Sequence, residues 1–173
     1  MNIQDTASGV ALWRQVADGI ERGSGTYVET RRLAYPLRSR TRFSEIVGAG
    51  GREPRGQFID ATEEEATREL ARELGLKTGA PLVRIESVRL ADRTPICVST
   101  TWLSAERFPD AGKVFANVRS MTKLVAHYGI RDFRRASTRI TAGIVDATDA
   151  ARLDLVLGRP VLVVDSKIGR AHV

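Results

Sequence analysis

The sequence carries the same order of local signals twice, and this repeat constrains the fold more than any other feature. In the first copy, a helix is expected to start at a T-x-x-E capping box, Thr62 to Glu65, and to stop at Gly75. A proline-led strand, Pro81–Leu90, follows it. The order of the first copy is therefore helix, glycine, proline and strand.

The second copy lies further along the chain. Asp146 or Thr148 is expected to cap its helix, and Gly158 is expected to stop it. Pro160 then leads a strand that includes Val161–Val164. Two copies of one order predict an internal duplication of an α+β unit.

Three further elements fit between the copies. Apolar alternation predicts strands at Ile96–Leu103 and Phe133–Ile144, and a helix is expected at Ser120–Tyr128, stopped by Gly129. Together with the two copies, they predict the α+β class. We expect a mixed, largely antiparallel sheet with helices on one side.

Composition narrows the class of protein. The chain has 173 residues, of which 42% are hydrophobic and 28% charged, as in ordinary globular proteins. No apolar run approaches the roughly 20 residues that span a bilayer. The polar start MNIQDTASG is unlike a signal peptide. We therefore expect a cytoplasmic protein without a membrane partner.

The residues that usually carry metal or nucleophilic chemistry are few. Cys97 is the single cysteine, and the histidines are His127 and His172, so a zinc-like ligand cluster cannot be assembled. Cys97 lies in an expected strand as a small buried side chain, and His127 lies on an expected helix without a nucleophile beside it. The sequence predicts no catalytic residues, no metal and no cofactor.

Basic residues indicate an anionic partner. The net charge is +6, and in the segment YPLRSRTRFSE the alternate residues Arg38, Arg40 and Arg42 come just before Phe43, Ser44 and Glu45. Strand alternation puts Val83, Ile85, Ser87 and Arg89 on one face of an expected strand, and Arg89 at its end needs a partner or water. These arginines predict a cradle for a phosphate-like group, since guanidinium forks bind such anions.

Two other segments carry groups that suit the same cradle. Ser120 and Thr122 start an expected helix, where free backbone N–H groups bind anions. In FRRASTRITAG, strand alternation puts Arg135, Ser137, Arg139 and Thr141 on one face as a basic stripe. A solvated strand face explains that stripe equally well.

The N-terminal part has a different pattern. Residues 8–23 are expected to form a short amphipathic helix that Ser8 caps, and the Gly-rich GSGTYVETRR follows directly. No second helix intervenes on which the first could pack. A helix docked on the main domain is one interpretation of this segment.

Several motifs in order resemble a known family: RTRFSE, VRLADRTPICVSTTWL, SMTKLVAHYGI, STRITAGIVDATDAARL and GRPVLVVDS. From Tyr35 to Ser166 the chain is similar to the UTRA effector-binding domain of the GntR superfamily, HutC subfamily, and most like phosphonate-metabolism repressors of the PhnF type. The resemblance implies a chorismate-lyase-like fold.

The resemblance also implies a ligand site and its size. It adds Phe43 to the residues that embrace an effector, and makes Arg89 an anion contact. Many members carry arginine where this chain has Ser87, and glutamate where it has Ser99; these departures favour a small phosphonate or phosphate over a sugar phosphate. The full set of expected ligand-binding residues is Arg40, Arg42, Phe43, Ser44, Arg89, Ser120, Thr122 and Arg139.

The resemblance implies a domain organisation as well. Residues 1–23 resemble the first helix of a winged helix-turn-helix, residues 24–34 its wing end and linker, and residues 35–166 the UTRA domain. Residues 167–173, KIGRAHV, have no periodicity of their own and are expected to be a non-native tail outside the fold. The implied protein is a dimeric repressor whose partners are a small anionic effector and, in longer relatives, operator DNA.

Two other function classes fit parts of the sequence. A chorismate-lyase-like enzyme has the same fold, but the wing-like GTYVE and the helix before it argue against one. A basic nucleic-acid module at Arg31–Arg55 has few aromatic residues on which bases could stack. The effector-binding domain is the function that the sequence favours.

The absence of a recognition helix between the first helix and the wing gives a prediction. We expect no specific binding of operator DNA by this chain, because no helix reaches base edges in the major groove. Titrations against the operator and against random DNA should give equal affinities that fall steeply with salt. A preference for the operator that survives moderate salt would contradict this.

Overall fold

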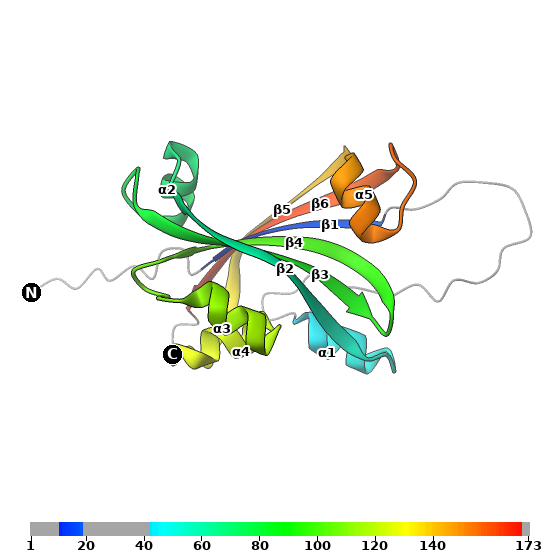
Figure 1. Cartoon of the computed structure of the whole chain (residues 1–173), viewed down its shortest axis with the longest axis horizontal. Coiled ribbons are helices and arrows are strands. Elements are labelled where there is room, and N and C mark those ends of the chain that lie inside the picture. The colour runs from blue at the N-terminus through cyan, green and yellow to red at the C-terminus, as the bar shows by residue number, and fades with distance from the viewer. Residues whose placement is uncertain (1–10, 19–41, 171–173) are drawn as a thin grey trace, which may run out of the picture.

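A computed structural model describes residues 11–18 and 42–170, which contain a six-stranded sheet with helices on both faces (Figure 1). Its strand order is β2-β3-β4-β1-β6-β5, and every neighbouring pair is antiparallel. The strands are β1 (Ala11–Asp18), β2 (Pro54–Glu65), β3 (Pro81–Ala91), β4 (Thr94–Ser104), β5 (Phe133–Ile144) and β6 (Pro160–Arg170).

Five helices connect or precede the described strands. They are α1 (Phe43–Ala49), α2 (Arg68–Leu74), α3 (Ala111–Val118), α4 (Met121–His127) and α5 (Ala147–Leu153). Figure 1 shows α1, α3 and α4 on one face of the sheet, here called the α4 face. The other face, here called the α2 face, carries α2 and α5.

The strand β3 explains why both faces are covered. Its residues Val83 and Ile85 pack in a buried cluster with Phe115 of α3. Leu82, one residue earlier, packs in a different cluster with Leu74 of α2. Because successive side chains point to opposite faces, a strand that is apolar on both faces needs cover on both. The prediction of helices on one side of the sheet was wrong.

The internal duplication is confirmed by matching turns. The units β2–α2–β3 and β5–α5–β6 correspond at a constant offset in sequence. After α2, the Leu76 N–H donates to the Ala71 carbonyl at 2.8 Å, and after α5, the Leu155 N–H donates to the Ala150 carbonyl at 2.9 Å. The same helix ending therefore leads into β3 and into β6.

The correspondence of the glycines differs from the expected one. Gly158 has φ 83°, like Gly79 with φ 81° at the same offset, so Gly158 matches Gly79 and not Gly75. The helix α2 ends at Gly75 as predicted, whereas α5 ends at Asp154, which also adopts the left-handed conformation. Aspartate tolerates that conformation better than most residues, which hides the end of α5 in the sequence.

The first helix begins later than predicted. Thr62 to Glu65 belong to β2, where they pair with β3. Instead, Thr67 caps α2: its Oγ1 accepts a hydrogen bond of 3.2 Å from the Leu70 N–H. Both threonines suit an N-cap, and the backbone hydrogen bonds offered by β3 decide between them.

Other predicted elements agree with the structure. The expected strand at Phe133–Ile144 is β5, and the strands expected at Pro81–Leu90 and Ile96–Leu103 lie within β3 and β4. Ser120 caps α4, and Asp146 caps α5.

The helix predicted for residues 8–23 was wrong where the structure describes it. Ala11–Asp18 forms β1, which pairs with β4 along one edge and with β6 along the other. The physical reason is that β4 and β6 both present backbone groups that need partners, and a strand between them satisfies both. The rest of that segment, and the wing and linker at 24–34, lie outside the described residues, so the winged-helix assignment stays a prediction.

The strand β6 also runs further than expected. Its ladder continues through Lys167 to Arg170, and Ile168 is 2% exposed within the cluster of α3 and α4. Excluding residues 167–170 from the fold was therefore wrong; their pairing with β5 orders them without a periodic pattern. Residues 171–173 lie outside the described residues.

The position of the α2 cap gives a prediction with a matched control. Thr67→Ala should lower the free energy of unfolding by about 1 kcal/mol, because the Leu70 N–H loses its acceptor. Thr62→Ala, at an exposed strand position, should cost clearly less. Urea unfolding of both variants measures the difference, and a larger loss from Thr62→Ala would restore the predicted capping box.

The pairing of β1 can be tested by a disulfide. Ala17 lies directly opposite Cys97 in the β1–β4 register, at a separation that disulfides span. We expect Ala17→Cys to form an intramolecular disulfide with Cys97 on refolding in a glutathione buffer, as detected by mass spectrometry of peptides. Val16→Cys is the control, since neighbouring residues of a strand face opposite sides. Equal yields from the two variants would mean that β1 is not paired as described.

Candidate functional site

Buried polar side chains gather on the α4 face of the sheet. Ser87 and Ser99 face each other across β3 and β4, and are 3% and 1% exposed. Thr101 of β4 and Ser166 of β6 are also buried, and the register puts both on the same face. These four residues are here called the hydroxyl floor. It interrupts the apolar side chains that the strands present to α3 and α4, such as Ile85, Leu103 and Ile168.

Arg89 stands at the edge of this floor. Its side chain is 8% exposed, and its Cζ lies 5.9 Å from the centroid of the Phe43 ring at the start of α1. Arg89 pairs with Cys97 in the β3–β4 register, so Ser99 is its diagonal neighbour at about 7 Å on the same face. A buried positive charge therefore lies beside hydroxyl groups.

Ser99 is unusual among the buried hydroxyls. Its Oγ is buried and has no hydrogen-bond partner among the described residues. A buried hydroxyl without a partner costs about 1–3 kcal/mol, so such atoms call for an explanation. A ligand that accepts a hydrogen bond here would remove that cost.

The start of α4 lies close to the same region because β2 has a glycine there. Gly56 lies opposite Arg89 in the β2–β3 register, and a Cβ at Gly56 would lie 2.4 Å from the Arg119 carbonyl oxygen. Only glycine lets the α3–α4 junction come this close to β2. Ser120 follows Arg119, and its Oγ accepts from the Lys123 N–H at 3.4 Å. The predicted residue Ser120 is thus brought near Arg89, with half-buried Thr122 in the first turn of α4.

Arg42 has its own partners. Its guanidinium lies 3.6 Å from an Asp132 carboxylate oxygen and 3.9 Å from one of Glu45, and 5.0 Å from the centroid of the Phe133 ring. These contacts attach α1 to the beginning of β5. Ser44, two residues later, is exposed.

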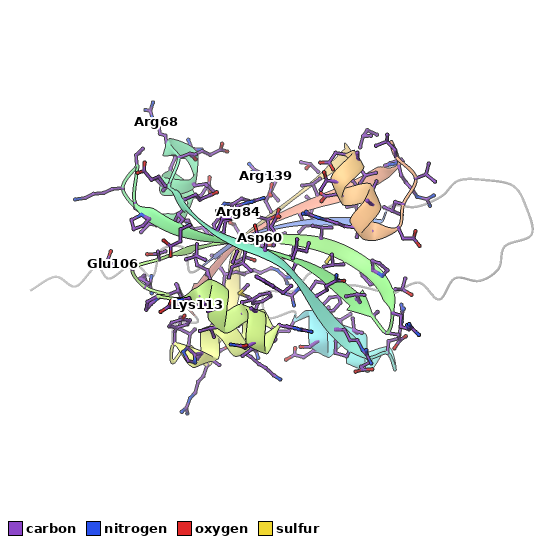
Figure 2. The ribbon with its side chains drawn as sticks, viewed as in Figure 1. Asp60, Arg68, Arg84, Glu106, Lys113 and Arg139 are labelled. Carbon is purple, nitrogen blue, oxygen red and sulfur yellow. The ribbon has the colours of Figure 1, made fainter. Side chains whose placement is uncertain are left out.

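Arg139 does not join the other predicted residues. It pairs with Asp165 of β6, and its side chain is 68% exposed on the α2 face, with a carboxylate oxygen of Asp165 3.4 Å away. Figure 2 shows Arg139 on the side of the sheet that carries α2, and Lys113 on the opposite side. Arg40, the remaining predicted residue, lies outside the described residues.

A β-bulge breaks the predicted basic stripe. The register of β5 shifts between Arg135 and Ser137, so Arg135 faces Ile168 on the α4 face while Ser137 and Arg139 lie on the α2 face. Placing Arg135 on the same face as Arg139 was wrong. Arg135 is 9% exposed, on the face that carries the hydroxyl floor.

The site carries little nucleophilic chemistry. Burial raises the pKa of the Cys97 thiol to about 11, although the charge of Arg89 acts in the opposite direction. The thiol is therefore protonated at neutral pH and is a poor nucleophile. Within residues 11–18 and 42–170, no three histidine, cysteine, aspartate or glutamate side chains gather closely enough to hold a metal ion. None of the described helices is long and apolar enough to cross a membrane.

Comparison with curated proteins gives similar chains among bacterial regulators. The chain is 33% identical over 145 residues to the uncharacterized HTH-type transcriptional regulator RB1450 of Rhizobium meliloti, covering 83% of this chain and 59% of that protein. It is 28% identical over 157 residues to the HTH-type transcriptional repressor PhnF of Mycolicibacterium smegmatis, covering 90% and 64%. The chain thus spans about three fifths of the length of these relatives.

Solved structures show the same fold. The crystal structure of PhnF from Mycobacterium smegmatis matches with a TM-score of 0.68 at 23% identity, covering 86% of this chain and 72% of that one. YydK from Bacillus subtilis, described as a possible transcriptional regulator, matches with a TM-score of 0.61 at 15% identity, covering 90% and 71%.

The family follows from a direct match. The model of the UTRA domain matches residues 49–168, which is more than half of the chain and includes the whole hydroxyl floor together with Arg89 and α4. The chain belongs to the UTRA domain family.

Proposed function

We propose that this chain is the effector-binding part of a GntR-superfamily, HutC-subfamily transcriptional regulator, a repressor of phosphonate or phosphate-related metabolism. Its effector is a small phosphonate or phosphate anion bound on the α4 face at Arg89. The observation that carries this proposal is the buried guanidinium of Arg89 beside the Ser99 Oγ, which lacks a partner among the described residues.

The chemistry of the floor fits a tetrahedral oxyanion. A guanidinium offers two parallel N–H groups to two oxygens of a phosphoryl group, and charge-assisted hydrogen bonds of this kind are about twice as strong as neutral ones. The hydroxyls of Ser99 and Ser87 donate to further oxygens. The small side chains at these two positions leave room for the anion, and neither adds a charge of its own.

A route from this site to the rest of a regulator passes through α1. The Phe43 ring contacts Arg89, and the neighbouring Arg42 is tied to Asp132 and Phe133 of the second half. An anion on Arg89 changes the charge that the Phe43 ring faces, so it favours one position of α1 over another. In the complete regulator, a homodimer on operator DNA, the effector acts by this difference in affinity between two arrangements.

The role is not enzymatic. The Cys97 thiol has a pKa raised by burial to about 11, and the hydroxyl floor has no histidine beside it in the described part of the chain. The floor offers hydrogen-bond donors and a fixed positive charge, which are the requirements of binding.

Binding can be measured by thermal shift with inorganic phosphate and methylphosphonate. A ligand that binds only the folded state adds about 2.7 kcal/mol at a hundredfold excess over its Kd. Arg89→Ala should abolish most of this shift, because a charge-assisted contact contributes about 1.5–3 kcal/mol. Arg68→Ala is the matched control, since it removes the same charge from an exposed position on α2, on the other face (Figure 2). Equal losses from the two variants would mean a diffuse basic surface.

A second variant separates binding from folding. Ser99→Ala should leave the unliganded protein as stable or slightly more stable, because it removes a buried hydroxyl that has no partner among the described residues. The same change should weaken anion binding by about tenfold to a hundredfold, because a hydrogen bond to a charged group contributes about 1.5–3 kcal/mol. Unchanged affinity in Ser99→Ala would remove the hydroxyl floor from the proposed site.

A further inference from the structure

The α2 face carries a groove that the proposed effector site does not use. It lies between α2 and the β5–β6 edge of the sheet and has a volume of about 340 Å³. Glu69 and Glu73, one helical turn apart, line its helix side, while Arg139 and Lys167 line its sheet side. Trp102 of β4 completes the lining as an aromatic surface. Asp165 of β6 also lines the sheet side, so the helix wall is acidic while the sheet wall carries two cations and one carboxylate.

The floor of the groove is fixed by the sheet. The register puts Trp102, Lys167 and Ser137 in one row across β4, β6 and β5, with β1 between the first two, which is three strand spacings or about 14 Å. The Trp102 indole N–H donates to a carboxylate oxygen of Glu64 at 2.8 Å, so the ring has a defined orientation.

Comparison of the two duplicated halves shows how the charge on the helix side of this groove differs from that of its counterpart. At the offset that relates the two halves, Glu73 of α2 corresponds to Arg152 of α5, and Asp165 of β6 corresponds to Glu86 of β3. In the second half, the Arg152 guanidinium lies 3.3 Å from a carboxylate oxygen of Glu86 and closes α5 onto the sheet. In the first half, the helix presents the carboxylate of Glu73 where α5 presents a cation.

Local ion pairs leave charges on both walls of the groove. Asp165 forms an ion pair with Arg139 of the edge strand β5, at 3.4 Å. Among the described residues, the cation nearest to Glu73 is Arg72, 3.8 Å away and 76% exposed, where an ion pair contributes little. Glu69 and Lys167 make no ion pair with any residue in the described ranges. A ligand with both charges would complement the two walls at once.

We propose that this groove binds a small zwitterion that carries an ammonium group and an acidic group. The ammonium lies at Glu69 and Glu73, the acidic group lies at Lys167 and Arg139, and the hydrocarbon between them lies on Trp102. This site is on the opposite face from Arg89 and does not depend on the proposed phosphonate effector.

The walls predict a requirement for both charges in one molecule. The probes are 4-aminobutanoate and 6-aminohexanoate, with butylamine and butanoate as the singly charged controls. The two tryptophans are Trp13 and Trp102, so Trp13→Phe makes Trp102 fluorescence specific for the groove. We expect a saturable change with at least one zwitterion, and about tenfold weaker binding of each control, since one charge-assisted contact is lost. The same titration, followed by the Trp102 indole N–H signal in NMR spectra of the unsubstituted chain, guards against an effect of Trp13→Phe.

Substitutions on each wall assign the binding to the groove. Glu73→Gln and Lys167→Gln should each weaken the zwitterion about tenfold, while Glu106→Gln, an exposed carboxylate on the β4–α3 turn (Figure 2), should leave it unchanged. Methylphosphonate binding on the other face should survive both groove substitutions. Absence of a saturable signal, equal binding of butylamine, or insensitivity to Glu73→Gln and Lys167→Gln would each overturn the proposal.

Discussion

The backbone pairing of β1 holds the two halves of the protein in one sheet. The strands β2, β3 and β4 form one ladder, β5 and β6 form another, and Ala11–Asp18 lies between them with partners on both sides. Both candidate sites extend across this strand. Ser99 and Ser166 of the hydroxyl floor flank it on the α4 face, and Trp102 and Lys167 flank it on the α2 face. Loss of this pairing would therefore open both sites as well as the sheet.

The sequence predicts this fold best where a signal is local. The local signals are the prolines that begin β3 and β6, the Ser120 and Asp146 caps and the Gly75 stop. Each acts within a few residues, and the structure has each of them where it was expected. Partners distant in sequence decide the rest. Thr62 could cap a helix, but it pairs with β3 instead. The segment around Val16 has helical spacing, but it forms a strand that pairs with β4 and β6.

The candidate site was predictable in part for the same reason. Strand alternation correctly groups Ser87 with Arg89, because β3 is regular between them. One bulge in β5 is enough to send Arg135 and Arg139 to opposite faces, and no residue in FRRASTRITAG marks it. That the Ser99 Oγ has no partner among the described residues could not be foreseen either, since this depends on what packs over β4.

The duplicated halves keep their backbone and differ in their charges. Both helix endings retain the same hydrogen bonds, yet α5 carries Arg152 toward Glu86, while α2 carries Glu73 near Asp165. The carboxylates of Glu73 and Asp165 would repel each other. Arg139 of the edge strand β5 offsets this repulsion by pairing with Asp165. A cation on the edge strand cannot fill the space under the helix as a helix arginine does. The groove is therefore a consequence of supplying the same counter-charge from a different strand.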